Sequence, residues 1–165
     1  LGLMIPSMML IIPQFVLTKQ LHLIDNLWAL VLFYVSGNLA LNTFLLRSFF
    51  EGIPRELDEA MEVDGANVWT RYWRLAMPLA RPALATTVIF TFLATWDEFA
   101  WALTVISTET KRTLPIAIQL FHGQNSTQWG LVFAASLIAI LPVIVVYLIF
   151  QRHFVAGLTA GAVKG

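Results

Sequence analysis

Two adjacent carboxylic acids, Asp97 and Glu98, stand in the middle of a run of residues that is otherwise almost entirely apolar. The run extends from about residue 83 to residue 106, and the acids lie in the stretch TWDEFAW. A single Asp at the centre of a membrane helix costs roughly 2.5–3.5 kcal/mol. Both acids are therefore expected to face a polar cavity or partner groups inside the protein rather than lipid.

The residues around Asp97 indicate what such a cavity would bind. On a continuous helix Asp97 shares one face with Phe90, Ala94, Trp101 and Thr104. A carboxylate next to an aromatic ring suits a sugar, because sugar hydroxyls donate to the acid and the ring stacks on the sugar face. Four residues are candidates for lining a substrate path: Ala94, Asp97, Glu98 and Trp101. A structural hydrogen bond between spans, a gating contact or pairing with a cation stays open as the alternative role of the acids.

The sequence contains no other arrangement typical of catalysis or metal binding. There is no Cys, which excludes disulfides, thiolate chemistry and Cys-bound metals. The three histidines are isolated, at no spacing typical of metal ligands: His22, His122 and His153. No G-x-x-x-x-G-K-[ST] phosphate-binding loop occurs, so we expect neither an enzyme nor a bound cofactor. The net charge of zero gives no indication of a nucleic-acid partner.

The elements that would position the two acids are membrane-spanning helices. Of the 165 residues 58% are hydrophobic and 12% are charged, about half the charged fraction of a soluble domain. Four runs approach the length of about 20 apolar residues that crosses a bilayer: about 1–17, 27–46, 83–106 and 129–150. Pro142 in the last run is tolerated in a membrane helix as a kink. The chain begins with Leu1 inside an apolar run, and we expect an N-terminal part with further spans to be missing.

The basic residues predict which side of the membrane each connection faces. Seven lie between the second and third spans or after the fourth: Arg47, Arg55, Arg71, Arg74, Arg81, Arg152 and Lys164. The opposite side holds Lys19, Lys111 and Arg112. Because cytoplasmic loops carry the excess of Lys and Arg, the second connection and the C-terminus are expected to be cytoplasmic. The polar connection over residues 107–128 then lies outside.

The polar segment between the second and third spans, about residues 51–82, is expected to form two short helices. Gly65 predicts the end of the first helix and a turn. Asn67 predicts the N-cap of a second helix, which runs to about Met77 and is ended by Pro78 and Pro82. Four apolar or aromatic side chains of the two helices would face water unless a partner protein or lipid headgroups covered them: Met61, Val68, Trp69 and Tyr72.

This segment, EAMEVDGANVWTRYWRLAMPLARP, resembles the EAA loop of ABC importer permeases, which reads E-A-A, three residues, G, about eleven residues, and L-P. The matching residues are Glu59, Ala60, Asp64, Gly65, Ala66, Pro78 and Pro82. Met61 departs from the pattern, because a second Ala is usual there. The tail GLTAGAVKG, residues 157–165, looks like the C-terminal end of carbohydrate permeases of the maltose-system type. The WDEF stretch is similar to the W-N-E-F of the same subfamily, with Asp97 at the Asn position.

The resemblance implies an all-α membrane protein with the type I ABC importer permease fold. This is a multi-span helical bundle with a cytoplasmic two-helix coupling loop, and residues 1–165 would be one permease domain that supplies the last four of six spans. Its expected function is ATP-driven import of a sugar or oligosaccharide into a bacterial cell. The implied partners are two copies of a cytoplasmic ATPase, a second permease, an extracytoplasmic sugar-binding protein and membrane lipid. The coupling to the ATPase would involve Glu59, Ala60, Met61, Asp64, Gly65, Ala66 and Pro78.

Three other functions are compatible with the residues. An importer of the same fold could carry a non-sugar solute, such as a glycerol phosphodiester. A proton-coupled secondary transporter could use Asp97 or Glu98 as a proton relay and would need no coupling loop. A membrane scaffold would have no transport path, and the two central acids argue against it.

Overall fold

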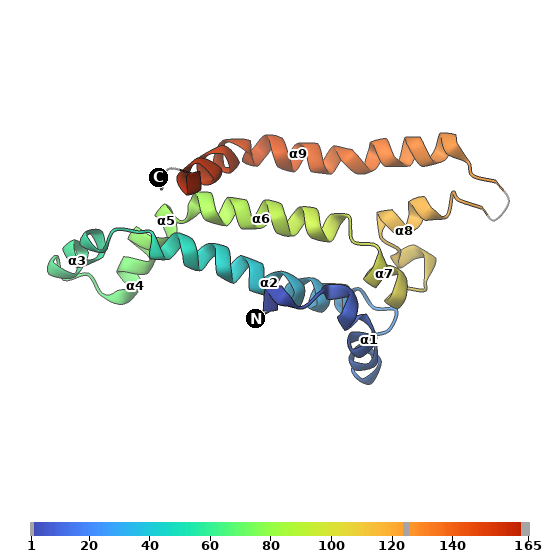
Figure 1. Cartoon of the computed structure of the whole chain (residues 1–165), viewed down its shortest axis with the longest axis horizontal. Helices are drawn as coiled ribbons and strands as arrows, with labels where there is room; N and C mark the ends of the chain where they lie inside the picture. Colours follow the sequence, from blue (N-terminus) through green and yellow to red (C-terminus); the bar gives the residue numbers. More distant parts are fainter. Residues whose placement is uncertain (1, 124–125, 163–165) are drawn as a thin grey trace. The chain divides into compact units, whose positions relative to one another are not determined.

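The computed structural model describes residues 2–123 and 126–162, and side chains as far as Gln151 (Figure 1). Leu1 and residues 163–165 lie outside the described residues, so the end of the tail that resembles sugar permeases is not among them. Every regular element of the described residues is helical: η1 (Gly2–Met4), η2 (Ser7–Leu10), α1 (Ile11–Gln20), α2 (Leu27–Glu51), α3 (Arg55–Val63), α4 (Val68–Arg71), η3 (Tyr72–Ala76), α5 (Met77–Leu79), α6 (Arg81–Trp96), α7 (Ala100–Val105), η4 (Glu109–Lys111), α8 (Leu114–Gln119) and α9 (Trp129–Ala162). The predicted all-α class is confirmed.

Two helices of the described residues are each long and apolar enough to cross a membrane. They are α2, with 25 residues, and the 23 residues Trp129–Gln151 of α9. These two helices cover the predicted spans over 27–46 and 129–150, and α9 continues through Pro142. A third crossing results if the pair Val68–Leu79 and Arg81–Trp96, which is bent by 65°, is counted as one span.

The first predicted span, over about 1–17, is wrong as a single helix. The chain forms the 3-10 turns η1 and η2 there, followed by the ten-residue α1, which is about 15 Å long. Pro6 is extended, with φ −61° and ψ 127°, and precedes η2. Pro13 lies in the first turn of α1, where its missing N–H leaves no hydrogen bond unmade. Prolines therefore divide an apolar run that has the composition of a span.

The chain divides into two compact units. The first comprises Leu1–Ala40 and Phe92–Val146, and the second comprises Leu41–Thr91 and Tyr147–Gly165. In the second unit the apolar helices α2 and α6 share a polar contact, because the Asn42 side-chain amide donates to the Thr91 hydroxyl over 2.8 Å. In the first unit the Trp96 indole donates to the Ala139 carbonyl of α9 over 3.1 Å. Such hydrogen bonds join membrane helices where apolar contact alone gives little driving force.

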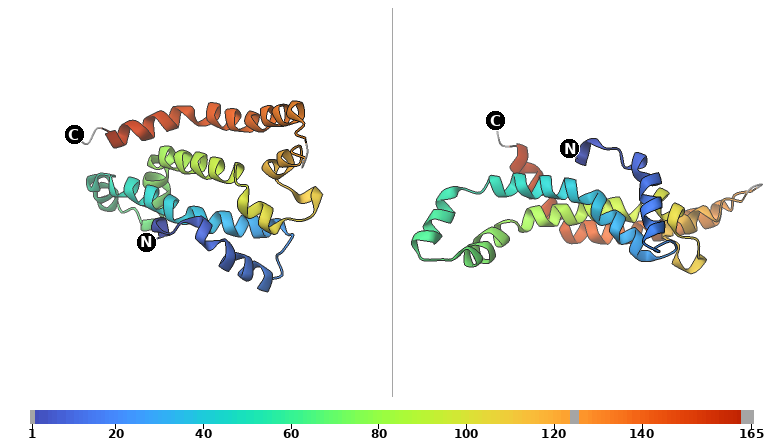
Figure 2. Two further views of the ribbon diagram at one scale, coloured as in Figure 1. Left: turned by 45° about the vertical axis from the view of Figure 1, so that its right-hand side comes forward. Right: turned by 90° about the horizontal axis from the view of Figure 1, so that it is seen from below.

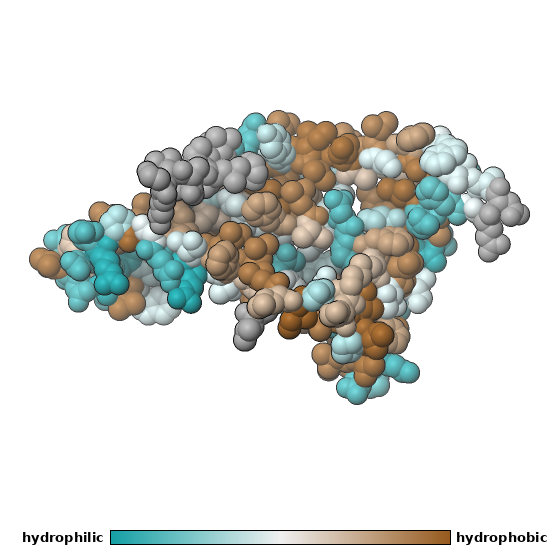
Figure 3. All heavy atoms as spheres, in the orientation of Figure 1, coloured by the Kyte–Doolittle hydropathy of each residue, from teal (hydrophilic) through white to brown (hydrophobic). Residues whose placement is uncertain are grey.

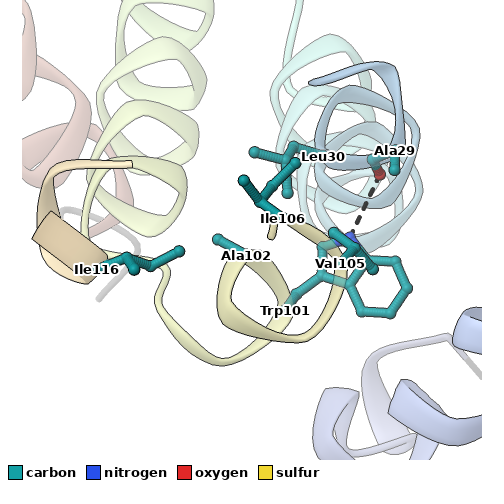
Figure 4. Close-up of a cluster of buried hydrophobic side chains, with 7 residues drawn as sticks. All are labelled: Ala29, Leu30, Trp101, Ala102, Val105, Ile106 and Ile116. Carbon is teal, nitrogen blue, oxygen red and sulfur yellow. Dashed lines mark hydrogen bonds between the residues drawn. The ribbon is translucent and has the colours of Figure 1, made fainter. Parts of the chain in front are cut away.

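The core of the first unit lies between α7 and the first turns of α2. Seven buried residues form it: Ala29, Leu30, Trp101, Ala102, Val105, Ile106 and Ile116 (Figure 4). Trp101 is only 1% exposed, and its ring stacks on Phe33 with the centroids 4.8 Å apart. Its indole N–H donates to the Ala29 carbonyl over 3.3 Å (Figure 4). This tryptophan therefore fastens α7 to α2.

Asp25 joins the connection before α2 to the segment that follows α7. Its Oδ1 accepts hydrogen bonds from the backbone N–H groups of Ser107 and Thr108, at 2.9 Å and 2.8 Å. Its Oδ2 accepts from the Thr108 hydroxyl at 2.5 Å and from the Lys111 ammonium at 3.0 Å. These donors, the Thr108 hydroxyl first, hold the pKa of the Asp25 carboxyl well below its usual range. We call this set of contacts the Asp25 strap.

The Asp25 strap is expected to weaken in acid. Because the pKa of Asp25 is lower in the folded chain than the unfolded value of about 3.9, its stabilisation is fully present above that pH and is lost as the pH falls below it. Amide hydrogen exchange of residues 105–111 should therefore accelerate between about pH 4 and pH 2, after correction for intrinsic rates. In Asp25→Asn the same amides should exchange fast at every pH in this range, because the variant has no carboxyl group at residue 25. Equal pH dependence in both proteins would contradict the assignment.

Candidate functional site: the α3–α4 loop and the break before α7

The turn after α3 is built on Gly65. Its φ of +78° lies in the left-handed region, which costs residues with a side chain roughly 1–2 kcal/mol. The Gly65 N–H donates to the Glu62 carbonyl and the Ala66 N–H donates to the Met61 carbonyl, both over 2.9 Å. These two bonds satisfy carbonyls at the end of the helix, in the pattern of a Schellman motif. The predicted turn at Gly65 is confirmed.

The second helix of the loop begins as predicted but continues differently. The Asn67 side-chain oxygen accepts from the Thr70 N–H over 2.8 Å, which confirms the predicted N-cap. After the four residues of α4 the helix widens into the π-helical segment η3, where the Met77 N–H donates to the Tyr72 carbonyl. The helix then passes through Pro78 and ends at Leu79, so Pro78 does not stop it. Pro78 has no N–H and cannot make the regular α-helical hydrogen bond. The π-helical segment Tyr72–Ala76 lies directly before the turn that contains this proline.

An ion-pair cluster joins α3 to α4. The Arg71 guanidinium contacts the Asp58 carboxylate at 3.4 Å and also hydrogen-bonds to Glu62. The two helices lie beside each other in all three views (Figures 1 and 2). The sequence analysis missed this cluster, although opposite charges on two helices joined by a tight turn are a signal for it.

Replacing Arg71 should loosen the loop. In Arg71→Gln we expect the opening equilibrium of α3 to rise by about fivefold, because an exposed ion-pair network contributes roughly 1 kcal/mol. Hydrogen exchange of the amides of residues 55–63 measures this change. Arg74→Gln is the matched control, because Arg74 is exposed on the same segment. Equal exchange rates in the two variants would show that the cluster adds no rigidity.

The loop exposes large apolar and aromatic side chains. The exposed fractions are 88% for Val63, 69% for Val68, 72% for Trp69 and 60% for Trp73. On the surface of α3 and α4 hydrophobic and hydrophilic atoms lie next to each other (Figure 3). Of the predicted coupling residues, Glu59, Ala60, Asp64, Gly65 and Pro78 are exposed, and Met61 and Ala66 are half-buried. The surface is therefore accessible to a partner and offers it both apolar area and charge.

The two central acids lie where the third predicted span is interrupted. Helix α6 ends at Trp96 and α7 begins at Ala100, so the prediction of one helix over 83–106 is wrong. The Glu98 carboxylate caps the new helix, because its Oε1 accepts from the Trp101 N–H at 2.7 Å and its Oε2 accepts from the Ala102 N–H at 3.0 Å. In a continuous helix these N–H groups would bind backbone carbonyls four residues earlier. The carboxylate takes their place and starts a new helix.

Glu98 also has a partner on α2. The Tyr34 hydroxyl donates to Glu98 Oε2 over 3.1 Å, across 64 positions of sequence. Tyr34 was not among the predicted site residues, and the only signal for it in the sequence is a polar hydroxyl within an apolar span. The structural hydrogen bond between helices that the sequence left open as an alternative is therefore present at Glu98.

The break changes what the predicted substrate-path residues can do. Trp101 was expected to share a face with Asp97, but its ring is stacked on Phe33 in the core and is not available to stack on a solute. Ala94 and Asp97 are exposed. The Asp97 carboxylate makes no hydrogen bond or ion pair with any residue that the structure describes. Among the described residues no group of three or more His, Asp or Glu lies close enough together to hold a metal ion.

Three relatives of this chain are transport permeases. The chain is 39% identical over 160 residues to the sulfoquinovosyl glycerol transport system permease protein of Agrobacterium fabrum, with 97% of this chain and 56% of that protein aligned. It is 38% identical over 167 residues to the trehalose/maltose transport system permease protein of Thermococcus litoralis, with 100% and 60% aligned. It is 34% identical over 163 residues to the arabinooligosaccharides transport system permease protein of Bacillus subtilis, with 99% and 57% aligned. The chain thus spans little more than half the length of these relatives.

A family match covers nearly the whole chain. Residues 1–160 match the family described as binding-protein-dependent transport system inner membrane component. The helical fold, the apolar helices and the EAA-like loop agree with such a protein. The chain belongs to the family of binding-protein-dependent transport system inner membrane components, which are ABC transporter permeases.

Proposed function

We propose that this chain is part of the permease subunit of an ATP-driven importer that moves a sugar or oligosaccharide into a bacterial cell. The observation that carries the proposal is the α3–α4 loop. Its turn is fixed by Gly65, its helices are joined by Arg71, and it exposes Trp69 and Val63. A well-ordered helix pair with exposed apolar side chains is suited to bind another protein.

The proposed partner of the loop is a separate cytoplasmic ATPase, present in two copies. Glu59 and Ala60 are exposed on α3 and would contact the ATPase directly, while Met61 is half-buried and would support them. Closure of the ATPase on binding ATP would move the docked loop, and the loop would transmit this motion to the spans. ATP hydrolysis itself would take place on the partner.

The remaining proposed partners follow from the expected topology. The α3–α4 loop and the C-terminus would lie in the cytoplasm, with the segment around Ser107 and Thr108 outside. An extracytoplasmic binding protein would deliver the solute on that outer side. A second permease subunit and membrane lipid would cover the apolar faces of α2 and α9, where Trp28, Leu39 and Phe133 are among the exposed side chains.

A sugar is the solute that the exposed acid favours. Asp97 is exposed at the break between α6 and α7, and a carboxylate accepts hydrogen bonds from hydroxyl groups. The names of the relatives, which include trehalose/maltose, arabinooligosaccharides and sulfoquinovosyl glycerol, support a sugar or a sugar derivative as the solute.

The proposal is tested by purifying the full-length protein from its own membranes in a gentle detergent. We expect an ATPase and a second permease to co-purify with it, as identified by mass spectrometry. Glu59→Arg should lose the ATPase and keep the second permease. Glu56→Arg, a charge reversal on the same exposed helix outside the EAA-like pattern, should keep both. Absence of an ATPase from the native preparation in several detergents would remove the main support for coupling.

The energy source separates this proposal from a proton-coupled transporter. Uptake into proteoliposomes should require internal ATP and should persist when a protonophore collapses the proton gradient. Uptake that stops with the protonophore and ignores ATP would favour the relay function of Asp97 or Glu98.

A further inference from the structure

The two adjacent acids have opposite surroundings. The Glu98 carboxylate accepts three hydrogen bonds, from the backbone N–H groups of Trp101 and Ala102 and from the Tyr34 hydroxyl. It is half-buried, whereas Asp97 is exposed and has no partner among the described residues. Two neighbouring carboxylates thus have different surroundings, and only the tertiary contacts distinguish them.

The break at residues 97–99 decides which way Asp97 points. In an unbroken helix Asp97 and Trp101 would lie on the same face, four residues apart. The face of Trp101 is buried in the core against Ala29 and Phe33. Continuing α6 through the break would therefore place Trp101 on the face of Asp97, and the two residues could not both keep their present surroundings. The interruption leaves Trp101 in the core and keeps Asp97 exposed.

We propose that Glu98 is a positioning residue of the solute path, held by Tyr34, and that Asp97 alone of the two acids contacts the solute. By capping the start of α7, the Glu98 carboxylate presents Asp97 at the break. The part of the proposal that concerns the solute rests on the transport function proposed above. Its geometric part, the control of residue 97 by Glu98 and Tyr34, is measurable without transport.

Thiol labelling of the full-length protein in its complex tests the geometry. The 165 residues contain no Cys, so Asp97→Cys introduces a single reactive thiol into this part of the protein. A charged methanethiosulfonate reagent should label it rapidly, and the transported sugar should slow the labelling. Adding Glu98→Ala should slow labelling by roughly tenfold, the effect expected for loss of hydrogen bonds to a charged group. Glu98→Gln should restore part of the rate, because its amide oxygen still accepts from one N–H.

Tyr34→Phe provides a milder test that does not threaten folding. It removes one of the three hydrogen bonds to Glu98 and should slow labelling at residue 97 by a few-fold, while the two bonds from the backbone N–H groups remain. Tyr147→Phe is the matched control, because Tyr147 is 53% exposed on α9. It should leave the labelling rate unchanged.

Transport kinetics and a second thiol complete the test. Asp97→Asn, with no other change, should raise the KM for the sugar by about tenfold, the size expected for one hydrogen bond to a charged group. Glu98→Cys should label slowly, and the sugar should not protect it. Protection of Glu98→Cys by the sugar, or unchanged labelling at residue 97 in both Glu98→Ala and Tyr34→Phe, would overturn the proposal.

The outcomes also separate this proposal from the proposed function. If uptake is ATP-driven but Glu98→Ala leaves both labelling and KM unchanged, only the role of Glu98 fails. If the native complex shows no ATP-driven uptake, the transport function fails. In that case the labelling rates still decide whether Glu98 and Tyr34 hold residue 97 at the break.

Discussion

Gly65→Pro is expected to abolish ATP-driven uptake and the co-purification of the ATPase. Proline fixes φ near −65°, whereas Gly65 has a φ of +78°. Proline also removes the N–H that donates to the Glu62 carbonyl. Both changes break the turn that sets α4 beside α3, so the surface offered to the ATPase would be lost. Uptake and the amount of bound ATPase, each at equal membrane expression, are the measurements.

A graded series at Gly65 distinguishes the turn from a general loss of folding. No atom lies within 4 Å of a Cβ added at Gly65, so side chains there meet no steric clash and differ only in backbone preference. Gly65→Asn should retain most of the uptake, because Asn tolerates the left-handed region. Gly65→Ala should lower uptake several-fold, because the left-handed conformation costs Ala roughly 1–2 kcal/mol.

Gly130 supplies the control for this series. It also has open space around an added Cβ, lies in the first turn of α9 and has no positive φ. Gly130→Ala should therefore transport normally. Normal coupling in Gly65→Pro, or the same loss in Gly65→Asn as in Gly65→Pro, would show that the turn geometry does not control docking.

Trp101→Ala is expected to cause the largest loss of stability of any single substitution considered. Truncating a buried aromatic side chain costs roughly 3–5 kcal/mol, and Trp101 is 1% exposed. The change removes the stack on Phe33 and the hydrogen bond to Ala29, which together fasten α7 to α2. The midpoint temperature of the purified full-length protein in detergent should fall by on the order of 10 °C.

Two further variants assign this loss to the core contacts. Trp101→Phe keeps a six-membered ring to stack on Phe33 but loses the rest of the indole with its N–H, so it should cost about 1–2 kcal/mol, less than Trp101→Ala. Trp28→Ala removes a tryptophan that is 64% exposed and should change the midpoint little. Recovery after heating, measured by fluorescence-detected size-exclusion chromatography, gives the midpoints. Equal midpoints for Trp101→Ala and Trp28→Ala would contradict the placement of Trp101 in the core.

The sequence by itself determined the elements that depend on local signals. The apolar runs predicted the long helices α2 and α9, because helix length and hydropathy are properties of contiguous residues. The turn at Gly65 and the cap at Asn67 were also predicted, because a left-handed residue and an N-cap act within one helical turn. The EAA-like loop and the family follow from the same local pattern.

The tertiary structure decided the features that depend on which distant groups meet. Periodicity placed Asp97 and Trp101 on one face, but that reasoning assumes an unbroken helix. The chain breaks after Trp96, and the Glu98 carboxylate caps the next helix by accepting from two of its backbone N–H groups. The hydroxyl of Tyr34 that holds Glu98 comes from another helix, 64 positions away. The Asp25 strap depends likewise on partners more than 80 positions along the chain. A side chain that accepts hydrogen bonds can replace the backbone only where folding brings its partners together, and the spacing of residues in the sequence does not contain that information.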